Sequence, residues 1–430
     1  MKKIISAAVA AVMSLTLLAG CSGGDKSANG KTKLLLGLPG GDGLTPWKIV
    51  ENFKEANKDK YVVEEDTSAW SDFTQKIKLQ FVSKNDVTPV FVTDSMQAIS
   101  FGAQGAVMDL QSWVDEKIDK TLYNKALTTL TDKEGHLWGV PHGLNSIAMV
   151  INKDIFAEKG VEIPTEDWTW QEMLDLAKKL TFTRADGTKV YGINYTSNIT
   201  QGWLPFMSAV GVQPYKDDFR NSNLDDPKVK DAMVKYRWAI DEGLVMPAAE
   251  LSAIGGAEQA FANGQIAMAL LQASSIKPIN NFAPDLNYDA IMMPIGWNGE
   301  RTCIYVPNSW QVYAGVSEDE KEGVLAWLEY FLSEEAQMII ANEGSSFPCM
   351  IKALDAVTNS GRKPEHIDAF YKGINEYGLT LLENPTSGTT RSVVDTMTSK
   401  IKAGDDIDAR IAEAHQTMQD ELDYFYESNE

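Results

Sequence analysis

The stretch LLLGL at residues 34–38 opens the part of the chain that decides the fold. It reads as a buried strand, and the turn sequence PGGDG at 39–43 ends it. The runs YVVE at 61–64 and PVFV at 89–92 read as further strands, and apolar side chains recur at helical spacing between the three runs. This strand–helix–strand–helix–strand order predicts an α/β domain with a parallel sheet covered by helices.

Open sheets of this kind bind ligands beyond the carboxyl ends of their strands. In this chain those ends are the loops 40–46, 67–72 and 93–97. The second loop carries Trp70 and Asp72, which are candidate ligand contacts by their position alone. Trp70 has the alternative role of a core or surface side chain.

Beyond this region, local signals mark the starts of several helices. Thr169 and Glu172 have the spacing of a capping box, and Ser317 and Glu320 form a second one. Asp226-Pro227 suits an N-cap followed by a first-turn proline. The turn-rich residues 139–143 end one strand–helix series, and an extended run at 147–152 starts another.

Composition narrows the function. The chain has 430 residues, enough for two or three domains, and a formal net charge of −21. Such a negative surface repels nucleic acid, so no nucleic-acid partner is expected. Four scattered histidines lack metal-ligand spacing, and no cofactor is expected. The sequence contains no P-loop, HExxH or GxSxG motif, although sixty acidic residues leave a secreted glycosidase as an alternative to a binding protein.

The N-terminal residues 1–20 have the basic start, short apolar run and small residues of a secretory signal. Leu18-Ala19-Gly20-Cys21 resembles the bacterial lipobox. That resemblance implies cleavage before Cys21, acylation of Cys21 with chains such as palmitate, and an extracytoplasmic protein anchored to a membrane. Residues 21–30 suit a flexible tether. The alternative is an ordinary signal peptide with an accidental cysteine.

Several blocks then follow in a characteristic order: GHLWGVP at 135–141, MVINKDIF at 149–156, WQEML at 170–174, AFANGQIAM at 260–268 and AWLEYFLS at 326–333. Each block alone has low specificity. Together with the lipobox, their order resembles the family-1 extracellular solute-binding proteins of bacterial ABC importers, the relatives of maltose-binding protein. The resemblance covers nearly all of the chain after the tether.

The resemblance implies a two-lobed, periplasmic-binding-protein-like α/β fold with the ligand in a cleft between the lobes. It places three hinge crossings at 143–147, 303–307 and 347–352. Lobe one would comprise 31–142 plus 308–346, and lobe two 147–302 plus 352–430. It further implies a monomer that captures a small-molecule solute and delivers it to an ABC permease.

Carrying over the family's ligand positions nominates residues in the strand-end loops, the first crossing and lobe two. These residues are Asp42, Asp94, Ser95, Gln97, Asn145, Trp203, Gln272, Ser274 and Arg391, and Trp310 is a further candidate near the second crossing. Each has an alternative role. Asp94 can cap a helix, Asn145 can satisfy hinge backbone, and Arg391 can form a surface ion pair. Trp203 and Trp310 can belong to the core.

A sugar needs flat aromatic faces and hydrogen-bonding side chains for its hydroxyls. Where maltose-type members place an aromatic residue, this chain has Gln272-Ala273-Ser274-Ser275. The departure disfavours a long maltodextrin and favours a smaller or more polar carbohydrate. Sugar acids, polyols and non-sugar solutes such as polyamines stay open.

Cys303 and Cys349 are the only cysteines after Cys21. The family layout puts them in the second and third crossings, which run side by side. A disulfide between them would stiffen the hinge, and the oxidising compartment permits it. The alternative is two small buried side chains that never meet.

Overall fold

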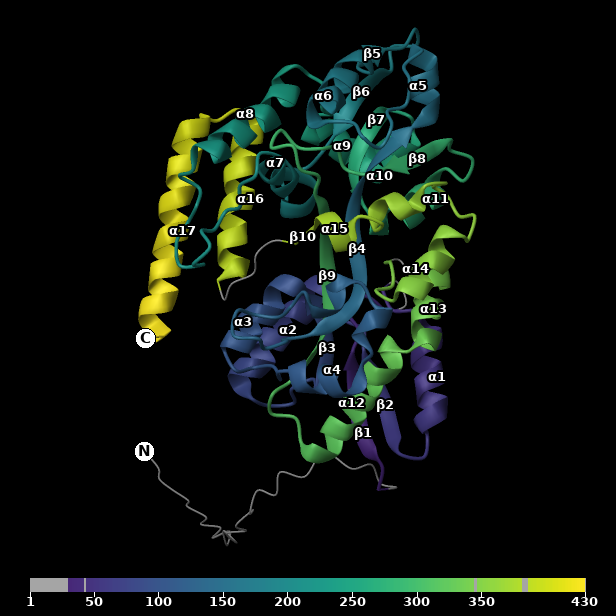
Figure 1. Ribbon diagram of the computed structural model, residues 1–430, viewed down its shortest axis with the longest axis vertical. Coiled ribbons are helices and arrows are strands. Elements are labelled where there is room, and N and C mark those ends of the chain that lie inside the picture. Colours follow the sequence, from purple (N-terminus) through teal and green to yellow (C-terminus); the bar gives the residue numbers. More distant parts are fainter. Residues whose placement is uncertain (1–29, 42–43, 344–345, 381–385, 430) are drawn as a thin grey trace, which may run out of the picture.

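The computed structural model describes residues 30–41, 44–343, 346–380 and 386–429, and it has two lobes stacked along its long axis (Figure 1). The purple and blue N-terminal elements and the green helices near residue 330 form lobe one. The teal elements and the yellow C-terminal helices form lobe two. Within the described ranges, every helix is too short or too polar to cross a membrane.

The first three strands of lobe one are parallel, as predicted from the stretch 34–92, but the sheet as a whole is mixed, because a later strand, β9 (Cys303–Val312), pairs antiparallel with β3. β1 pairs in parallel with both β2 and β3 because each of these strands is followed by a helix that returns the chain across the sheet. The elements of this lobe are β1 (Thr32–Gly37), α1 (Trp47–Asn57), β2 (Tyr61–Asp66), α2 (Trp70–Ser83), β3 (Val90–Asp94), α3 (Ser95–Ala103), α4 (Gln111–Lys117), η2 (Lys120–Leu122), η3 (Lys125–Thr128), α12 (Glu318–Leu332) and α13 (Glu334–Glu343).

Two long strands, β4 (Val140–Asn152) and β9 (Cys303–Val312), run antiparallel between the lobes (Figure 1). They join the two half-sheets into one ten-stranded sheet whose main order is β2-β1-β3-β9-β4-β7-β6-β5. At Leu144 the three predicted crossings lie side by side. Leu144 pairs with Pro307 of β9, and its backbone exchanges hydrogen bonds of 2.8 and 3.1 Å with Phe347.

Gly143 explains the close approach at this point. A Cβ atom on residue 143 would lie 2.2 Å from Ser346 Oγ, so only glycine lets the third crossing pack against the first. The strand register shifts between Pro141 and Gly143. β4 nevertheless begins at Val140, so residues 140–143, which the sequence analysis interpreted as turn-rich, belong to the strand.

Lobe two is built on the other half of the sheet. In it β6 and β7 are parallel, while β8 pairs antiparallel with β4. Its elements are α5 (Lys153–Lys159), α6 (Trp170–Lys179), β5 (Phe182–Thr183), β6 (Lys189–Asn194), η4 (Ile199–Trp203), α7 (Leu204–Ala209), α8 (Pro227–Asp241), α9 (Ala248–Ile254), α10 (Ala257–Ala262), β7 (Ile266–Gln272), η5 (Ala273–Ser275), α11 (Ile276–Phe282), β8 (Tyr288–Ile291), α16 (Ser387–Ala403) and α17 (Ile407–Asn429).

A short helical segment lies between the lobes and connects the third crossing to α16. It comprises α14 (Ile351–Thr358), η6 (Ile367–Phe370), α15 (Ile374–Tyr377) and β10 (Gly378–Leu379). β10 pairs in parallel with β9 at Cys303 and Ile304. The buried side chains of this segment belong to the same hydrophobic cluster as the core of lobe one, which therefore extends through the hinge.

A disulfide between Cys303 and Cys349, which the sequence left open beside two unpaired thiols, is not formed in this structure, where both thiols are free and buried. Their sulfur atoms face different partners. Cys303 Sγ lies 3.6 Å from the Phe370 carbonyl oxygen, and Cys349 Sγ lies 3.5 Å from Gln337 Oε1. Burial raises the pKa of each thiol to about 12, so neither forms a reactive thiolate near neutral pH. The alternative of two small buried side chains describes them.

Candidate functional site

The lobe-one edge of the interlobe region is formed where β3 ends and α3 begins. Asp94 is the N-cap of α3, and its Oδ1 accepts the Gln97 N–H at 3.2 Å. The capping role considered for Asp94 is therefore the one that its side chain has here. Ser95 is buried, and Gln97 is 9% exposed.

The other two strand-end loops of lobe one place fewer of the predicted site residues in the interlobe region. Trp70 opens α2 and is half-buried against the core of lobe one, whereas Asp72 is exposed in the first turn of that helix. Asp42 lies outside the described residues, as does Cys21. The structure therefore tests neither prediction.

Three predicted residues meet at the lobe-two side of the first crossing. Asn145 of β4 accepts the Ser274 N–H through Oδ1 at 3.2 Å. Gln272, at the end of β7, donates through Nε2 to Thr200 Oγ1 at 3.2 Å. These contacts fix polar side chains where β4 enters lobe two.

Sequence reasoning missed two neighbours of this group, Thr200 and Gln201. Both lie in η4, a single π-helical turn, and both are at least nine-tenths buried. Gln201 Nε2 donates to the Leu270 carbonyl at 3.1 Å. The available signal was Asn198, an N-cap whose Oδ1 accepts the Gln201 N–H at 2.9 Å.

The two predicted tryptophan platforms lie inside the lobes. Trp203 and Trp310 have no exposed surface, so neither ring offers a face to a solute in this structure. Trp203 packs in the core of lobe two, and Trp310 makes edge contacts with Trp327 and Phe331 in lobe one. Both follow the alternative core role, because a large apolar ring is stabilised most by complete burial.

Trp203 also connects the core to α16. Its Nε1 donates to Asp395 Oδ1 at 2.7 Å, and Arg391 Nε lies 3.5 Å from Asp395 Oδ2. Burial is the main influence on Asp395 and raises the pKa of its carboxyl, although the indole and the guanidinium oppose the shift. Arg391 thus forms the ion pair that was its alternative role.

The lobes touch where the first turn of α16 reaches α3. A Cβ atom on Gly388 would lie 3.6 Å from Gln97 Nε2, so these two residues are neighbours across the lobes. A cavity of about 980 Å³ lies beside this contact, between α2 and α3 on one side and residues 386–392 on the other. Gln97 is the predicted site residue that lines it.

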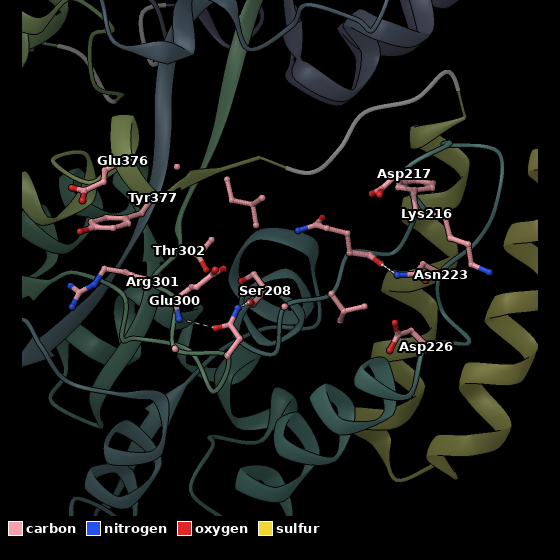
Figure 2. A pocket seen from close by; sticks show the side chains of 18 residues that line it. Ser208, Lys216, Asp217, Asn223, Asp226, Glu300, Arg301, Thr302, Glu376 and Tyr377 are labelled. Atoms are coloured by element: carbon pink, nitrogen blue, oxygen red, sulfur yellow. Dashed lines mark hydrogen bonds between the residues drawn. The ribbon is translucent and has the colours of Figure 1, made fainter.

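A second cavity, of about 920 Å³, lies on lobe two beside β10 (Figure 2). Arg301, Glu376 and Tyr377 stand on one side of it, and Lys216, Asp217 and Asp226 on the other. None of the predicted site residues that the structure describes lines it. Its lining comes from distant segments of the chain, which left no local signal in the sequence.

One group of potential metal ligands occurs among the described residues: Asp289, Glu365 and His366. His366 Nδ1 lies 2.8 Å from Asp289 Oδ2, and the Lys153 ammonium lies 3.8 Å from both carboxylates. Lys153 and His366 are the partners of these acids in the structure, so the three residues and Lys153 form a network of ion pairs and hydrogen bonds.

Two α/β lobes, joined by paired crossing strands and bearing polar side chains where they meet, define a two-lobed binding protein. Residues 48–366 match the family model described as bacterial extracellular solute-binding protein, and the chain belongs to that family. The resemblance and the fold inferred from the sequence blocks are thereby confirmed.

Known proteins agree with this assignment. The fold is similar to that of ABC substrate-binding protein Lmo0181 from Listeria monocytogenes in complex with cycloalternan, with a TM-score of 0.78, 21% identity and coverage of 92% of this chain and 99% of that one. A protein of Brucella abortus (strain 2308), named as a binding protein, is 24% identical over 243 residues, which are 56% of this chain and 57% of the relative. The sn-glycerol-3-phosphate-binding periplasmic protein UgpB of Brucella melitensis is 20% identical over 65% of each chain. The chain thus spans little more than half of the length of the first curated relatives it matches.

Proposed function

We propose that this protein is the substrate-binding component of a bacterial ABC importer, and that it captures a small carbohydrate by closing its lobes. The observation that carries the proposal is the hinge itself. β4 and β9 connect the lobes, and Asn145 and Ser274 meet where β4 enters lobe two. A solute held between the lobes contacts both of them only when they close, and it therefore shifts the open–closed equilibrium. The proposed lobe boundaries are those implied by the three crossings.

The side chains near the hinge favour a small, polar solute. Gln97, Asn145, Gln272 and Ser274 offer amide and hydroxyl groups, which pair with sugar hydroxyls as donors and acceptors. Trp70 is the half-buried aromatic ring among the proposed contacts. A short ligand with one stacked ring face fits this set better than a long oligosaccharide. The proposed role requires neither a cofactor nor a catalytic residue.

A thermal-shift screen tests the proposal. Sugars, sugar acids, polyols, a polyamine and sn-glycerol 3-phosphate are each added to the protein. A bound solute raises the melting temperature, because only the folded form binds it. Isothermal titration then gives its affinity, and the solute should be recovered chemically unchanged. A cleaved sugar would favour the glycosidase alternative, and a response to a polyamine alone would overturn the carbohydrate proposal.

Variants locate the site with the solute that the screen identifies. Asn145→Ala and Gln272→Ala should each weaken binding about 2- to 10-fold, the usual effect of one lost hydrogen bond. Gln171→Ala is the matched control, because Gln171 is exposed on α6 and donates to Asp175 one turn further along the same helix. Parent-like affinity in both site variants would place the solute elsewhere, with the cavity beside β10 as the next candidate.

We further propose that Cys21 carries a lipid anchor. The support is the sequence Leu18-Ala19-Gly20-Cys21 behind a signal-like run. Stable anchoring needs at least two acyl chains or an equivalent second signal. Because Cys21→Ala has no thiol to carry an acyl chain, it should move the protein from the membrane fraction to the aqueous fraction. Retention of that variant in the membrane fraction would contradict the anchor.

A further inference from the structure

Two loops meet across the lobes at a distance from the hinge. The first is the turn 131–136 of lobe one. Asp132 holds it together, because its carboxylate accepts the His136 N–H at 2.9 Å and the Trp138 indole N–H at 2.7 Å. The flanking residues Leu130 and Leu137 are buried in the core of lobe one, so this turn moves with that lobe.

The second is the loop 215–222 of lobe two, between α7 and α8. The Phe219 N–H donates to the Lys216 carbonyl at 2.9 Å, and Asp218 Oδ1 accepts the Arg220 and Asn221 N–H groups at 2.9 and 3.0 Å. Phe219 has a φ of +56°, an unfavourable conformation for a bulky side chain. Its ring packs against the core of lobe two, so this loop moves with lobe two.

Lys133 joins the two loops. Its ammonium donates to the Asp217 carbonyl oxygen and lies 4.1 Å from the centroid of the Phe219 ring. The same charge contributes to lowering the pKa of the Asp218 carboxyl, which is set mainly by its hydrogen bond with Asn221. A single lysine of lobe one is thus held by a carbonyl oxygen and a ring face of lobe two.

We propose that Lys133, Asp217 and Phe219 form an interlobe latch that stabilises the closed arrangement of the lobes. Hinge bending about β4 and β9 separates the two loops, so the contact exists only while the lobes are together. Breaking it therefore destabilises the closed form and leaves the fold of each lobe intact. Because a solute must be held by the closed form, the latch also sets the apparent affinity. The latch rests on the closing motion proposed above but not on the identity of the solute.

The strained Phe219 supports this role. A left-handed conformation at a bulky residue persists only when its surroundings fix it, and here the turn hydrogen bonds present the ring to Lys133. Asp217 also lines the second cavity, so the loop that carries the latch borders that cavity on lobe two.

Spin-label distances measure the latch directly, in the full-length chain without any solute and with Cys21→Ala in every variant, so that Cys21 takes up no label. One label goes on Val82→Cys of α2, a residue that is 84% exposed, and the other on Thr417→Cys of α17, which is also exposed. Cys303 and Cys349 stay unlabelled because they are buried and their thiol pKa is raised. The distance distribution then reports the open-to-closed ratio.

Lys133→Met keeps the length of the side chain and removes the charge, and Phe219→Leu removes the ring face. Each variant should raise the open-to-closed ratio about 3- to 30-fold, the range for a lost charged hydrogen bond and cation–π contact. Lys159→Met is the matched control, because the Lys159 ammonium lies 4.7 Å from the Phe182 ring within lobe two. It should leave the distances unchanged.

Lengthened distances in both latch variants but not in the control would establish the latch. Parent-like distances in both latch variants, or equal lengthening in all three variants, would overturn it. The melting temperature of each variant separates a latch effect from local unfolding. The thermal-shift screen on the parent is independent of these distances, so a failed latch and a failed solute-binding function give different results.

Discussion

At the scale of single residues, His142 links the hinge to the pH dependence of stability. It precedes Gly143 in β4, and its Nε2 lies 2.8 Å from Thr45 Oγ1. The ring is enclosed by Phe331 and Trp310, and burial lowers the pKa of His142 to about 3. In the unfolded chain the pKa of a histidine is about 6.5. Between these two values only the unfolded state takes up the proton, so the free energy of unfolding falls as the pH falls.

We therefore expect the parent to lose on the order of 1 kcal/mol of stability per pH unit through this group below about pH 6.5. His142→Gln, which does not titrate, should remove that part of the slope in urea unfolding between about pH 7 and about pH 5.5. His366→Gln should change the slope in the opposite direction, because the hydrogen bond that His366 Nδ1 donates to Asp289 Oδ2 raises the pKa of His366 and so stabilises the folded state as the pH falls. A parent-like slope in His142→Gln would show that the group is not buried as a neutral ring.

Individual site residues were only partly predictable. The sequence nominated Asn145, Gln272 and Ser274, which do meet, because the resemblance supplied positions that lie at strand ends. It did not separate buried from accessible tryptophans. The local sequence of Trp203 and of Trp310 does not separate a buried ring from an accessible one, and only the packing of the folded chain shows that both are enclosed. Thr200 and Gln201 were missed because a single π-helical turn has no periodic pattern.

At the scale of elements, the start of α6 shows how far a local signal reaches. Thr169 Oγ1 accepts the Glu172 N–H at 3.2 Å, and Glu172 Oε2 accepts the Thr169 N–H at 2.7 Å. Thr169→Ala should lower the free energy of unfolding by about 1 kcal/mol. The Glu172 N–H loses its acceptor, and the reciprocal bond from the Thr169 N–H to the Glu172 side chain is no longer held in place by the hydroxyl. Thr169→Ser retains the cap hydroxyl and should remain near the parent. Urea denaturation of both variants compares them, and equal stability of the two would contradict the cap.

Elements that local chemistry specifies were predicted well. The capping box at Ser317, the Asp226-Pro227 start and the parallel order of β1, β2 and β3 are all found. The start of β4 was misjudged, because Gly139 and Gly143 suggest a turn. Their true role is close approach, since a Cβ on Gly139 would lie 2.8 Å from the Trp310 carbonyl oxygen. Only the neighbouring strand reveals that reason.

At the scale of the whole molecule, the order of the sequence blocks predicted the two-lobed fold. It did not predict which residues of one lobe contact the other lobe. The Lys133–Phe219 contact joins residues 84 or more positions apart in the chain, and the Gln97–Gly388 contact joins the two lobes. The sequence around such residues does not indicate the contact. A lysine or a glutamine can equally well be exposed to solvent or bind a different partner, and the local pattern of charged and apolar residues is the same in each case. The pairing of Cys303 and Cys349 stayed open in the sequence for the same reason, since adjacent crossings do not fix the direction of a side chain.

Closure of the whole molecule should depend on the size of residue 388. In this structure a Cβ on Gly388 would make an ordinary contact of 3.6 Å with Gln97 Nε2, so Gly388→Ala should leave the lobes free to close. Gly388→Leu adds atoms beyond that Cβ, directly against α3, and should hold the lobes apart. Both substitutions are favourable within a helix, so α16 itself should remain formed. The label pair on Val82→Cys and Thr417→Cys should therefore show longer distances in Gly388→Leu than in Gly388→Ala. Identical distances in the two variants would mean that α16 and α3 do not meet when the lobes close.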